Sequence, residues 1–257
     1  MSAVLETAGL SVRFGGVHAL SDVALTVGEG RLVGLIGPNG AGKTTFVDAI
    51  CGFVRCSGRI ELDGRSLTGR SPHERARLGL ARTWQASELF DDLTVRENLN
   101  VAARRPSAWT VVRELFRSSP ESAPPVDEAL ETVDLEWAAD AMPTDLSQGQ
   151  RKLVGVARGI AMGPRILCLD EPAAGLDTTE SADLGRRLRA MADQGRSMLL
   201  IDHDMGLVLG ICDHIFVLEF GRLIAAGPPD EVRRDPGVVA AYLGSGAGER
   251  SDEGEPA

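Results

Sequence analysis

The strongest constraint on this chain is an eight-residue segment from Gly37 to Thr44 with the sequence GPNGAGKT. A short apolar run over 31–36 precedes it and a helical pattern over 45–51 follows it, which predicts a buried strand, a tight turn and a helix in succession. Glycines let successive backbone N–H groups turn inward, and a helix N-terminus adds partial positive charge. The segment therefore predicts a phosphate-binding loop, made of Gly37, Pro38, Asn39, Gly40, Ala41, Gly42, Lys43, Thr44 and Thr45.

Two side chains of this loop carry chemistry. Lys43 can bridge the β- and γ-phosphates of a nucleotide, and the Thr44 hydroxyl can hold Mg²⁺. The chain has only two lysines, Lys43 and Lys152, among 27 basic residues. A general preference for arginine explains that scarcity, but a retained lysine also marks a place where a compact ammonium is needed. A glycine-rich turn that matches by accident is the alternative, and the strand and helix on either side disfavour it.

Two adjacent carboxylates follow a second apolar run. Residues 166–169 read as a buried strand, and Asp170 and Glu171 come directly after it. Buried strands of a doubly wound sheet end at the ligand crevice. An Asp there can serve Mg²⁺, and the next acid can polarise a water for attack on a γ-phosphate. A solvated acidic turn is an equally good interpretation of the pair alone, but the phosphate loop upstream favours the site.

A third segment, Asp145 to Gln150 (DLSQGQ), opens a predicted helix. Ser147 and Gln150 have the spacing of a capping box, which many helices share. Together with the phosphate loop, however, the segment resembles the signature of the ATP-binding-cassette (ABC) ATPases, usually LSGGQ. Further family motifs stand in the family's order, and the resemblance covers about residues 4–243. They are Phe14 in the adenine-stacking position, Gln85 in a Q-loop, Asp177 in a D-loop and His203 in an H-loop.

The resemblance implies an ATP hydrolase with ATP and Mg²⁺ at the site. Glu171 would be the general base, and His203 would contact the γ-phosphate. Gln85 and Asp170 would serve Mg²⁺ and the attacking water, with Thr44 as a further Mg²⁺ ligand. Phe14 would stack on the adenine.

The resemblance also implies a head-to-tail dimer with two ATP molecules between the subunits. The signature of one subunit would face the phosphate loop of the other, and Asp177 would couple the two sites. The signature residues are Leu146, Ser147, Gln148, Gly149 and Gln150. Gln148 stands where the family has glycine, which could lower the affinity of the signature for ATP.

Several segments are similar to the larger ATPase of branched-chain amino-acid (Liv-type) importers. They are FGGVHAL from Phe14, ARTWQ from Ala81, LTVREN from Leu93, DHDM from Asp202 and AYLG from Ala241. The ATPases of urea and short-chain amide importers are very similar, so that alternative stays open. Trp84 and Asp202 depart from the family's usual Phe and Glu.

The same resemblance, with the alternation of strands and helices, implies an α/β fold of the P-loop ABC ATPase type. We expect a mostly parallel core sheet, an antiparallel β subdomain and an inserted helical subdomain. Residues 1–243 would form one ABC ATPase domain, with the helical subdomain over about 86–161, and residues 244–257 a disordered acidic tail. A looser piece over 104–125, rich in Pro, Ser and Arg, reads as an insertion.

Composition and resemblance also bear on partners. The net charge of −10 disfavours nucleic acid, because phosphate contacts need clustered Lys and Arg. No apolar run reaches the ~20 residues of a membrane span. Transport therefore needs a separate two-subunit permease. We expect the permease to dock beside Gln85, Leu89, Phe90 and the helix over 94–101. The resemblance implies a second ABC ATPase as partner, with a heterodimer favoured over a homodimer. It also implies an extracellular solute-binding protein, which would act through the permease and not touch this chain. The chain itself would lie at the cytoplasmic face of the plasma membrane as a peripheral protein.

Two other classes remain as alternatives. One is a soluble regulatory or repair ATPase of the same fold, which the absence of a coiled coil or extra domain disfavours. The other is a nucleotide-binding scaffold without turnover, against which Glu171 argues. The four cysteines have no metal-ligand spacing and read as inert thiols.

Overall fold

The structure is a computed structural model of the 257-residue chain, and it describes residues 2–83, 89–103 and 124–245. The strands are β1 (Ala3–Phe14), β2 (Val17–Gly28), β3 (Leu32–Ile36), β4 (Ser57–Leu62), β5 (Arg65–Ser66), β6 (Leu80–Arg82), β7 (Ile166–Asp170), β8 (Met198–Ile201), β9 (His214–Glu219) and β10 (Arg222–Gly227). The helices are α1 (Lys43–Cys51), α2 (Pro72–Leu78), α3 (Val95–Ala103), α5 (Pro124–Thr132), α6 (Gln148–Ala161), α7 (Thr178–Asp193), α8 (Met205–Ile211), α9 (Pro229–Val232) and α10 (Pro236–Ser245), with 3₁₀ turns η1 (Glu136–Ala138) and η2 (Pro143–Asp145).

The described strands form two sheets. The larger has six strands in the order β10-β9-β3-β8-β7-β6, in which every neighbouring pair is parallel except β9 and the edge strand β10. The smaller is an antiparallel sheet in the order β2-β1-β4-β5. The large sheet needs crossover connections, and helices supply them, as parallel pairing requires.

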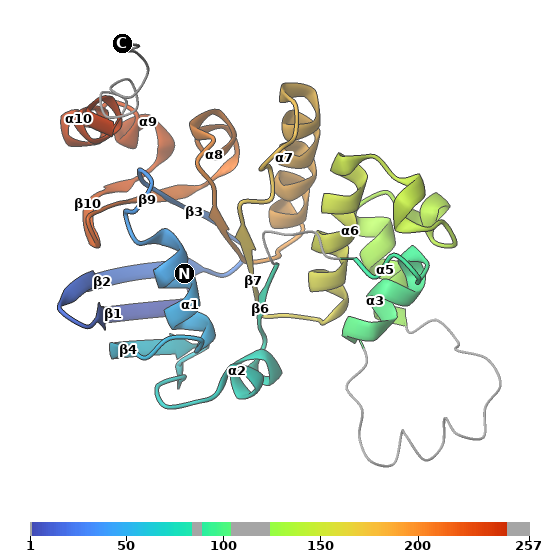
Figure 1. Cartoon of the computed structure of the whole chain (residues 1–257), viewed down its shortest axis with the longest axis horizontal. Helices are drawn as coiled ribbons and strands as arrows, with labels where there is room; N and C mark the ends of the chain where they lie inside the picture. Colours follow the sequence, from blue (N-terminus) through green and yellow to red (C-terminus); the bar gives the residue numbers. More distant parts are fainter. Residues whose placement is uncertain (1, 84–88, 104–123, 246–257) are drawn as a thin grey trace, which may run out of the picture.

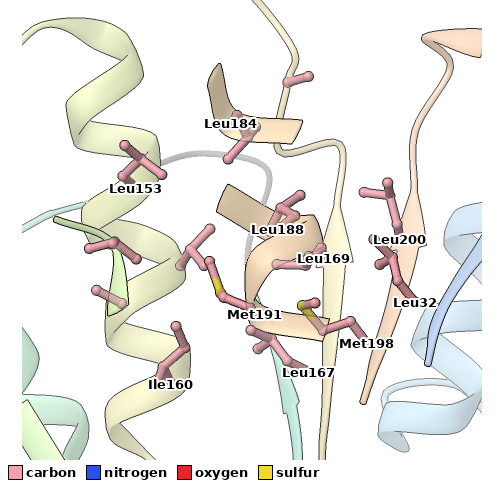
Figure 2. Packing of buried hydrophobic residues seen from close by; sticks show 14 of the residues in the cluster. Leu32, Leu153, Ile160, Leu167, Leu169, Leu184, Leu188, Met191, Met198 and Leu200 are labelled. Carbon is pink, nitrogen blue, oxygen red and sulfur yellow. The ribbon is translucent and has the colours of Figure 1, made fainter. Parts of the chain in front are cut away.

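The core lies on both faces of the large sheet, because successive side chains of a strand point to opposite faces. Val33 and Leu35 of β3 join a cluster with α1 and the antiparallel sheet, whereas Leu32 and Ile36 join a cluster with α6, α7 and α8. Figure 2 shows this second cluster, where leucines and methionines of α6 and α7 meet those of the strands. All five residues of β3 and of β7 are buried, which fits strands covered on both faces.

The elements gather into three groups (Figure 1). The antiparallel strands β1, β2 and β4 lie beside α1, the parallel strands stand in the middle, and α3, α5 and α6 pack together on the far side of β6 and β7. This confirms the expected fold class: a mostly parallel sheet with an antiparallel β part and a helical part that interrupts the core between β6 and β7.

Most predicted elements are present, and some differences are local. Strand β6 ends at Arg82, and α8 and the two-residue β5 were not predicted. Helix α10 continues to Ser245, two residues into the segment expected to be a disordered tail, and 246–257 lie outside the described residues. Most of the expected insertion, 104–123, also lies outside them. The domain boundaries stay a prediction.

Candidate functional site

The carboxyl ends of three neighbouring parallel strands meet at one edge of the large sheet. Ile201 at the end of β8 pairs with Leu35 of β3 on one side and with Asp170 of β7 on the other. The loops after these strands are the predicted phosphate loop, the segment from Glu171, and the segment from Asp202. The sheet therefore brings three of the predicted motifs to the edge where ligands of open α/β sheets bind.

The loop from Gly37 to Gly42 takes a shape that two glycines permit. Gly37 has φ 153° and its Cβ, if present, would lie 2.0 Å from the carbonyl oxygen of Leu218. Gly42 has φ 104° and its Cβ would lie 2.8 Å from the carbonyl oxygen of Ala19. Gly42 caps α1 without a side chain, and the first turn of α1 contains no acid. The N–H groups of that turn are therefore directed at a site suited to an anion.

The ammonium of Lys43 donates to two carbonyl oxygens of its own loop. Nζ lies 2.6 Å from the oxygen of Gly37 and 3.1 Å from that of Pro38, and the residue is 7% exposed. Burial lowers the pKa of Lys43, while the nearby carboxylates of Glu171, Asp170 and Asp202 act to raise it. The single buried cation of the loop thus faces all three acids of the neighbouring strand ends. Thr44, Asn39 and Gly40 are exposed.

Asp170 is buried at the end of β7 and is held by an arginine. Arg82 Nη2 donates to Asp170 Oδ2 at 2.6 Å, and the Asp170 side chain is 2% exposed. Burial raises the pKa of Asp170, and the hydrogen bond and charge of Arg82 oppose that rise.

Glu171 follows with a left-handed backbone, φ 47°. This conformation costs a non-glycine residue about 1–3 kcal/mol, and its surroundings must hold it in place. Its N–H donates to the carbonyl oxygen of Ile201 at 2.7 Å, which ties the turn to β8. The strained turn redirects the chain after Asp170, so that the two adjacent carboxylates differ in burial: Asp170 is buried and Glu171 half-buried.

The segment after β8 is organised by Asp202. This residue is fully buried, and its carboxylate accepts hydrogen bonds from the N–H groups of Ala173, His203 and Asp204 at 3.3, 2.8 and 3.0 Å. It thereby joins the loop after β8 to the loop after β7. The His203 side chain is 59% exposed, with Nδ1 3.6 Å from Asp202 Oδ1. His203 therefore stands at the rim of the site, where it can reach a ligand.

The signature segment begins α6, as predicted. Ser147 Oγ accepts from the N–H of Gln150 at 3.3 Å and Gln150 Oε1 accepts from the N–H of Ser147 at 2.9 Å, which is a capping box. Asp177 likewise caps α7, through the N–H groups of Thr179 and Glu180. The loop that precedes α7 passes close to the signature, because a Cβ added to Gly175 would lie 2.7 Å from Gln148 Nε2.

The structure therefore brings together some predicted site residues and separates others. The phosphate loop, Asp170, Glu171 and His203 share one edge of the sheet, whereas α6 lies across β6 and β7 from α1 (Figure 1). Phe14 ends β1 and is 52% exposed, which leaves its ring available for stacking. Gln85 lies outside the described residues.

Two residues at this edge were not assigned roles from the sequence. Asp202 was noted only as a departure from the family, and Arg82 only as part of a motif. The one signal for Arg82 was an arginine directly after two apolar strand residues, Leu80 and Ala81.

The oxygen donors at this edge of the sheet suit a small hard cation only if a bound nucleotide supplies further oxygen ligands. Thr44 and Asp170 offer oxygen atoms, yet the described residues hold no group of three His, Cys, Asp or Glu side chains able to bind a metal. Mg²⁺ typically binds through one or two carboxylates and takes its other ligands from water and substrate phosphates. The set suits that cation bound with a nucleotide.

A phosphate loop between β3 and α1, with acids at the end of a nearby parallel strand, defines the P-loop class of nucleotide-binding proteins. Comparison with protein families narrows this class: residues 20–174 match the model described as ABC transporter, and residues 222–248 match one described as branched-chain amino acid ATP-binding cassette transporter. The chain belongs to the ABC transporter family, as an ATP-binding and ATP-hydrolysing subunit.

Curated relatives align over nearly their whole length. The high-affinity branched-chain amino acid transport ATP-binding protein BraF of Pseudomonas aeruginosa is 41% identical, over 94% of this chain and 98% of its own. The protein of the same description named LivG, from Escherichia coli, is 38% identical over the same shares. The lipopolysaccharide export system ATP-binding protein LptB of Escherichia coli is 34% identical, again over 94% and 98%.

Solved structures agree with the fold. A nucleotide-free ATP-binding cassette from an ABC transporter superposes with a TM-score of 0.82 at 30% identity, covering 93% of this chain and 98% of that one. The ADP conformation of such a cassette gives 0.82 at 29% identity, over 95% and 100%. Within the residues that the structure describes, no helix combines the length and apolar character needed to cross a membrane.

Proposed function

We propose that this chain powers an importer of branched-chain or related amino acids, bound to a two-subunit permease at the cytoplasmic face of the plasma membrane. The observation that carries the proposal is the likeness at the C-terminal end: residues 222–248 match a family model specific to branched-chain amino acid cassettes. The likeness to BraF and LivG over 94% of the chain supports it.

Nucleotide binding is assigned to the phosphate loop. The N–H groups of residues 37–45 would surround the phosphates, and Lys43 would exchange its loop carbonyls for the β- and γ-phosphates. Phe14 would stack on the adenine. Thr44, Asp170 and Gln85 would hold Mg²⁺, which when bound supplies positive charge against the phosphate oxygens.

Hydrolysis is assigned to the acid after β7. Glu171 would accept a proton from the water that attacks the γ-phosphorus, because its carboxylate is less buried than that of Asp170 and lies beside the loop cation. His203 would contact the γ-phosphate and help to orient it. The buried Asp202 holds the backbone on both sides of the site by three hydrogen bonds, so these groups move little relative to each other.

Each site would be completed by a second ABC ATPase, which we expect to be a similar but different chain. The signature residues, Leu146 to Gln150, would face the partner's phosphate loop, with Asp177 coupling the two sites. ATP would join the subunits because both contribute groups that stabilise its charge. The loss of the γ-phosphate would then weaken the bridge.

The test is to extract the protein from its native membrane in mild detergent and identify what is recovered with it. A permease pair and a second ABC ATPase are expected, and the associated extracellular solute-binding protein would bind leucine, isoleucine or valine in calorimetry. A binding protein that takes urea or short-chain amides instead would overturn the assigned solute. Recovery without any membrane partner would overturn the transport role.

A second candidate is an export system, which the 34% identity to LptB over 94% of the chain favours. Exporters of that kind need no solute-binding protein that delivers cargo from outside. Two results together would favour export. One is recovery of a permease without such a binding protein, and the other is loss of solute efflux when this chain is depleted.

A further inference from the structure

Arg82 lies at a junction of three elements. It ends β6, and its two terminal nitrogens contact two acids: Nη1 lies 2.5 Å from Asp48 Oδ1 on α1, and Nη2 lies 2.6 Å from Asp170 Oδ2 on β7. The Arg82 side chain is 8% exposed. The guanidinium is planar and rigid, so the two contacts fix the position of one carboxylate relative to the other.

Asp48, the second partner of Arg82, lies on α1, the helix that also contains Lys43 and Thr44. Asp48 follows Thr44 by four residues in α1, and residues at this spacing share one face of a helix. Arg82 therefore links Asp170 to the face of α1 that presents the Thr44 hydroxyl. Because Arg82 contacts only Oδ2, the bridge orients the carboxylate without using both of its oxygens.

A buried ion bridge is a poor device for stability alone. Removing charges from water costs several kcal/mol, and apolar residues of similar volume often stabilise as well or better. We infer that Arg82 is a positioning residue: it ties the Asp170 carboxylate to α1 so that Asp170 and Thr44 meet the same metal–nucleotide complex. This inference rests on the role proposed for Asp170 as a ligand of Mg²⁺.

The measurable quantity is how much Mg²⁺ tightens nucleotide binding. It is the dissociation constant of a fluorescent, non-hydrolysable ATP analogue in EDTA divided by that in excess Mg²⁺. Hydrogen-bond partners of metal ligands typically change metal affinity by about 10–100-fold when replaced. In Arg82→Met we expect the tightening factor to fall by at least about 10-fold, while the affinity in EDTA changes less than about threefold.

Three further variants sharpen the test. Asp48→Asn removes the far anchor without touching Asp170, and it should lower the tightening factor about threefold or more. Arg165→Met is the matched control: Arg165 precedes β7 at its other end and pairs with Asp63 at 2.7 and 3.1 Å. It should leave the factor unchanged. Asp170→Asn tests the underlying role and should abolish the tightening.

The outcomes are distinct. An Arg82→Met protein that weakens binding equally in EDTA and Mg²⁺ overturns the inference, because the bridge would then be only structural. If circular dichroism shows that Arg82→Met does not fold, the Asp48→Asn variant decides: an unchanged tightening factor in that variant overturns the inference. If Asp170→Asn keeps the full tightening, the role proposed for Asp170 fails, whatever Arg82 does.

Discussion

Lys43 donates to two carbonyl oxygens of the loop that it would serve, so the loop is held in a closed shape before any phosphate enters. A nucleotide must replace those two hydrogen bonds, in which only the ammonium is charged, with contacts in which the phosphate acceptor is charged as well. The carboxylates of Glu171, Asp170 and Asp202 act on the ammonium of Lys43 and raise its pKa against the effect of burial. The loop cation therefore has two duties, shaping the loop and offsetting the charge of the strand ends.

Glu171→Gln should bind MgATP with an affinity within about threefold of the original chain and hydrolyse it at least about 100-fold more slowly. The amide keeps the shape of the side chain but cannot accept the proton, and general bases contribute about 10²–10⁴-fold. Calorimetry and steady-state phosphate release measure the two quantities. Unchanged turnover would refute the assignment of Glu171 as the base.

The cysteines should react poorly in the folded protein. Burial raises the pKa of Cys51 and of Cys212 to about 12, and raises that of Cys168 well above its usual value. Cys56 is half-buried, with a pKa also raised by burial. With a thiol reagent at pH 8 we expect at most slow labelling of Cys56, and four labelled thiols in urea. Rapid native labelling of Cys168 would contradict the packing around β7.

Helix starts are determined locally, and the sequence predicted them well. Ser147 with Gln150 forms the expected capping box at α6, and Thr94 with Glu97 forms another at α3, because each needs only residues three apart. Strands β3 and β7 were equally clear, since residues buried on both faces leave continuous apolar runs.

The bridge through Arg82 could not be predicted in the same way. Its two contacts join residues 34 and 88 positions apart, and only the packed sheet brings them together. The buried Asp202 is similar, because its carboxylate caps a loop 29 residues earlier in the chain. The motifs predicted where the candidate site lies, whereas the polar groups that support it depended on tertiary packing.

Asp213 joins the start of β3 to α7 just before β9. Its carboxylate accepts from the N–H of Leu32 at 2.9 Å and pairs with Arg31 and Arg189 at 3.2 and 3.3 Å. Burial alone would raise the pKa of Asp213, but these partners outweigh burial and lower it. A lowered pKa stabilises the fold above the unfolded value of about 3.9, and that stability is lost as pH falls through the folded pKa.

Asp213→Asn should therefore reduce the free energy of unfolding by about 1 kcal/mol at pH 7, and the difference from the original chain should shrink below about pH 4. Urea unfolding followed by circular dichroism at several pH values measures it. Asp193→Asn is the control, since the exposed Asp193 pairs with the same Arg189, and it should change stability by less than about 0.5 kcal/mol. A difference that grows in acid would contradict the prediction.

The fold holds the phosphate loop and the signature on opposite sides of β6 and β7, in separate groups of elements (Figure 1). A single subunit therefore cannot surround one nucleotide with both, if α6 keeps its place. We therefore expect ATP to assemble the proposed dimer, because two incomplete half-sites would become two complete ones in one step.

We expect Glu171→Gln, mixed with the second ATPase recovered from the membrane, to form a stable dimer with MgATP but not with MgADP. Size-exclusion chromatography with light scattering distinguishes the two masses. Adding Ser147→Glu should prevent assembly, because a carboxylate at the start of α6 would repel the partner's phosphates. A dimer of the same stability in MgADP would contradict the proposed bridge.

The placement of Lys43 gives this chain a built-in reporter. The sequence has only one other side-chain amine, that of Lys152. Reagents that acylate amines would therefore modify very few sites, and each would be resolved by mass spectrometry of the digested protein. Burial lowers the pKa of Lys43 and also that of Lys152, so each has a larger share of the neutral, nucleophilic form than an exposed lysine. The extent of acylation at Lys43, divided by that at Lys152 in the same sample, would report the fraction of phosphate loops that hold a nucleotide. The measurement needs no engineered label and works in membranes as well as in solution.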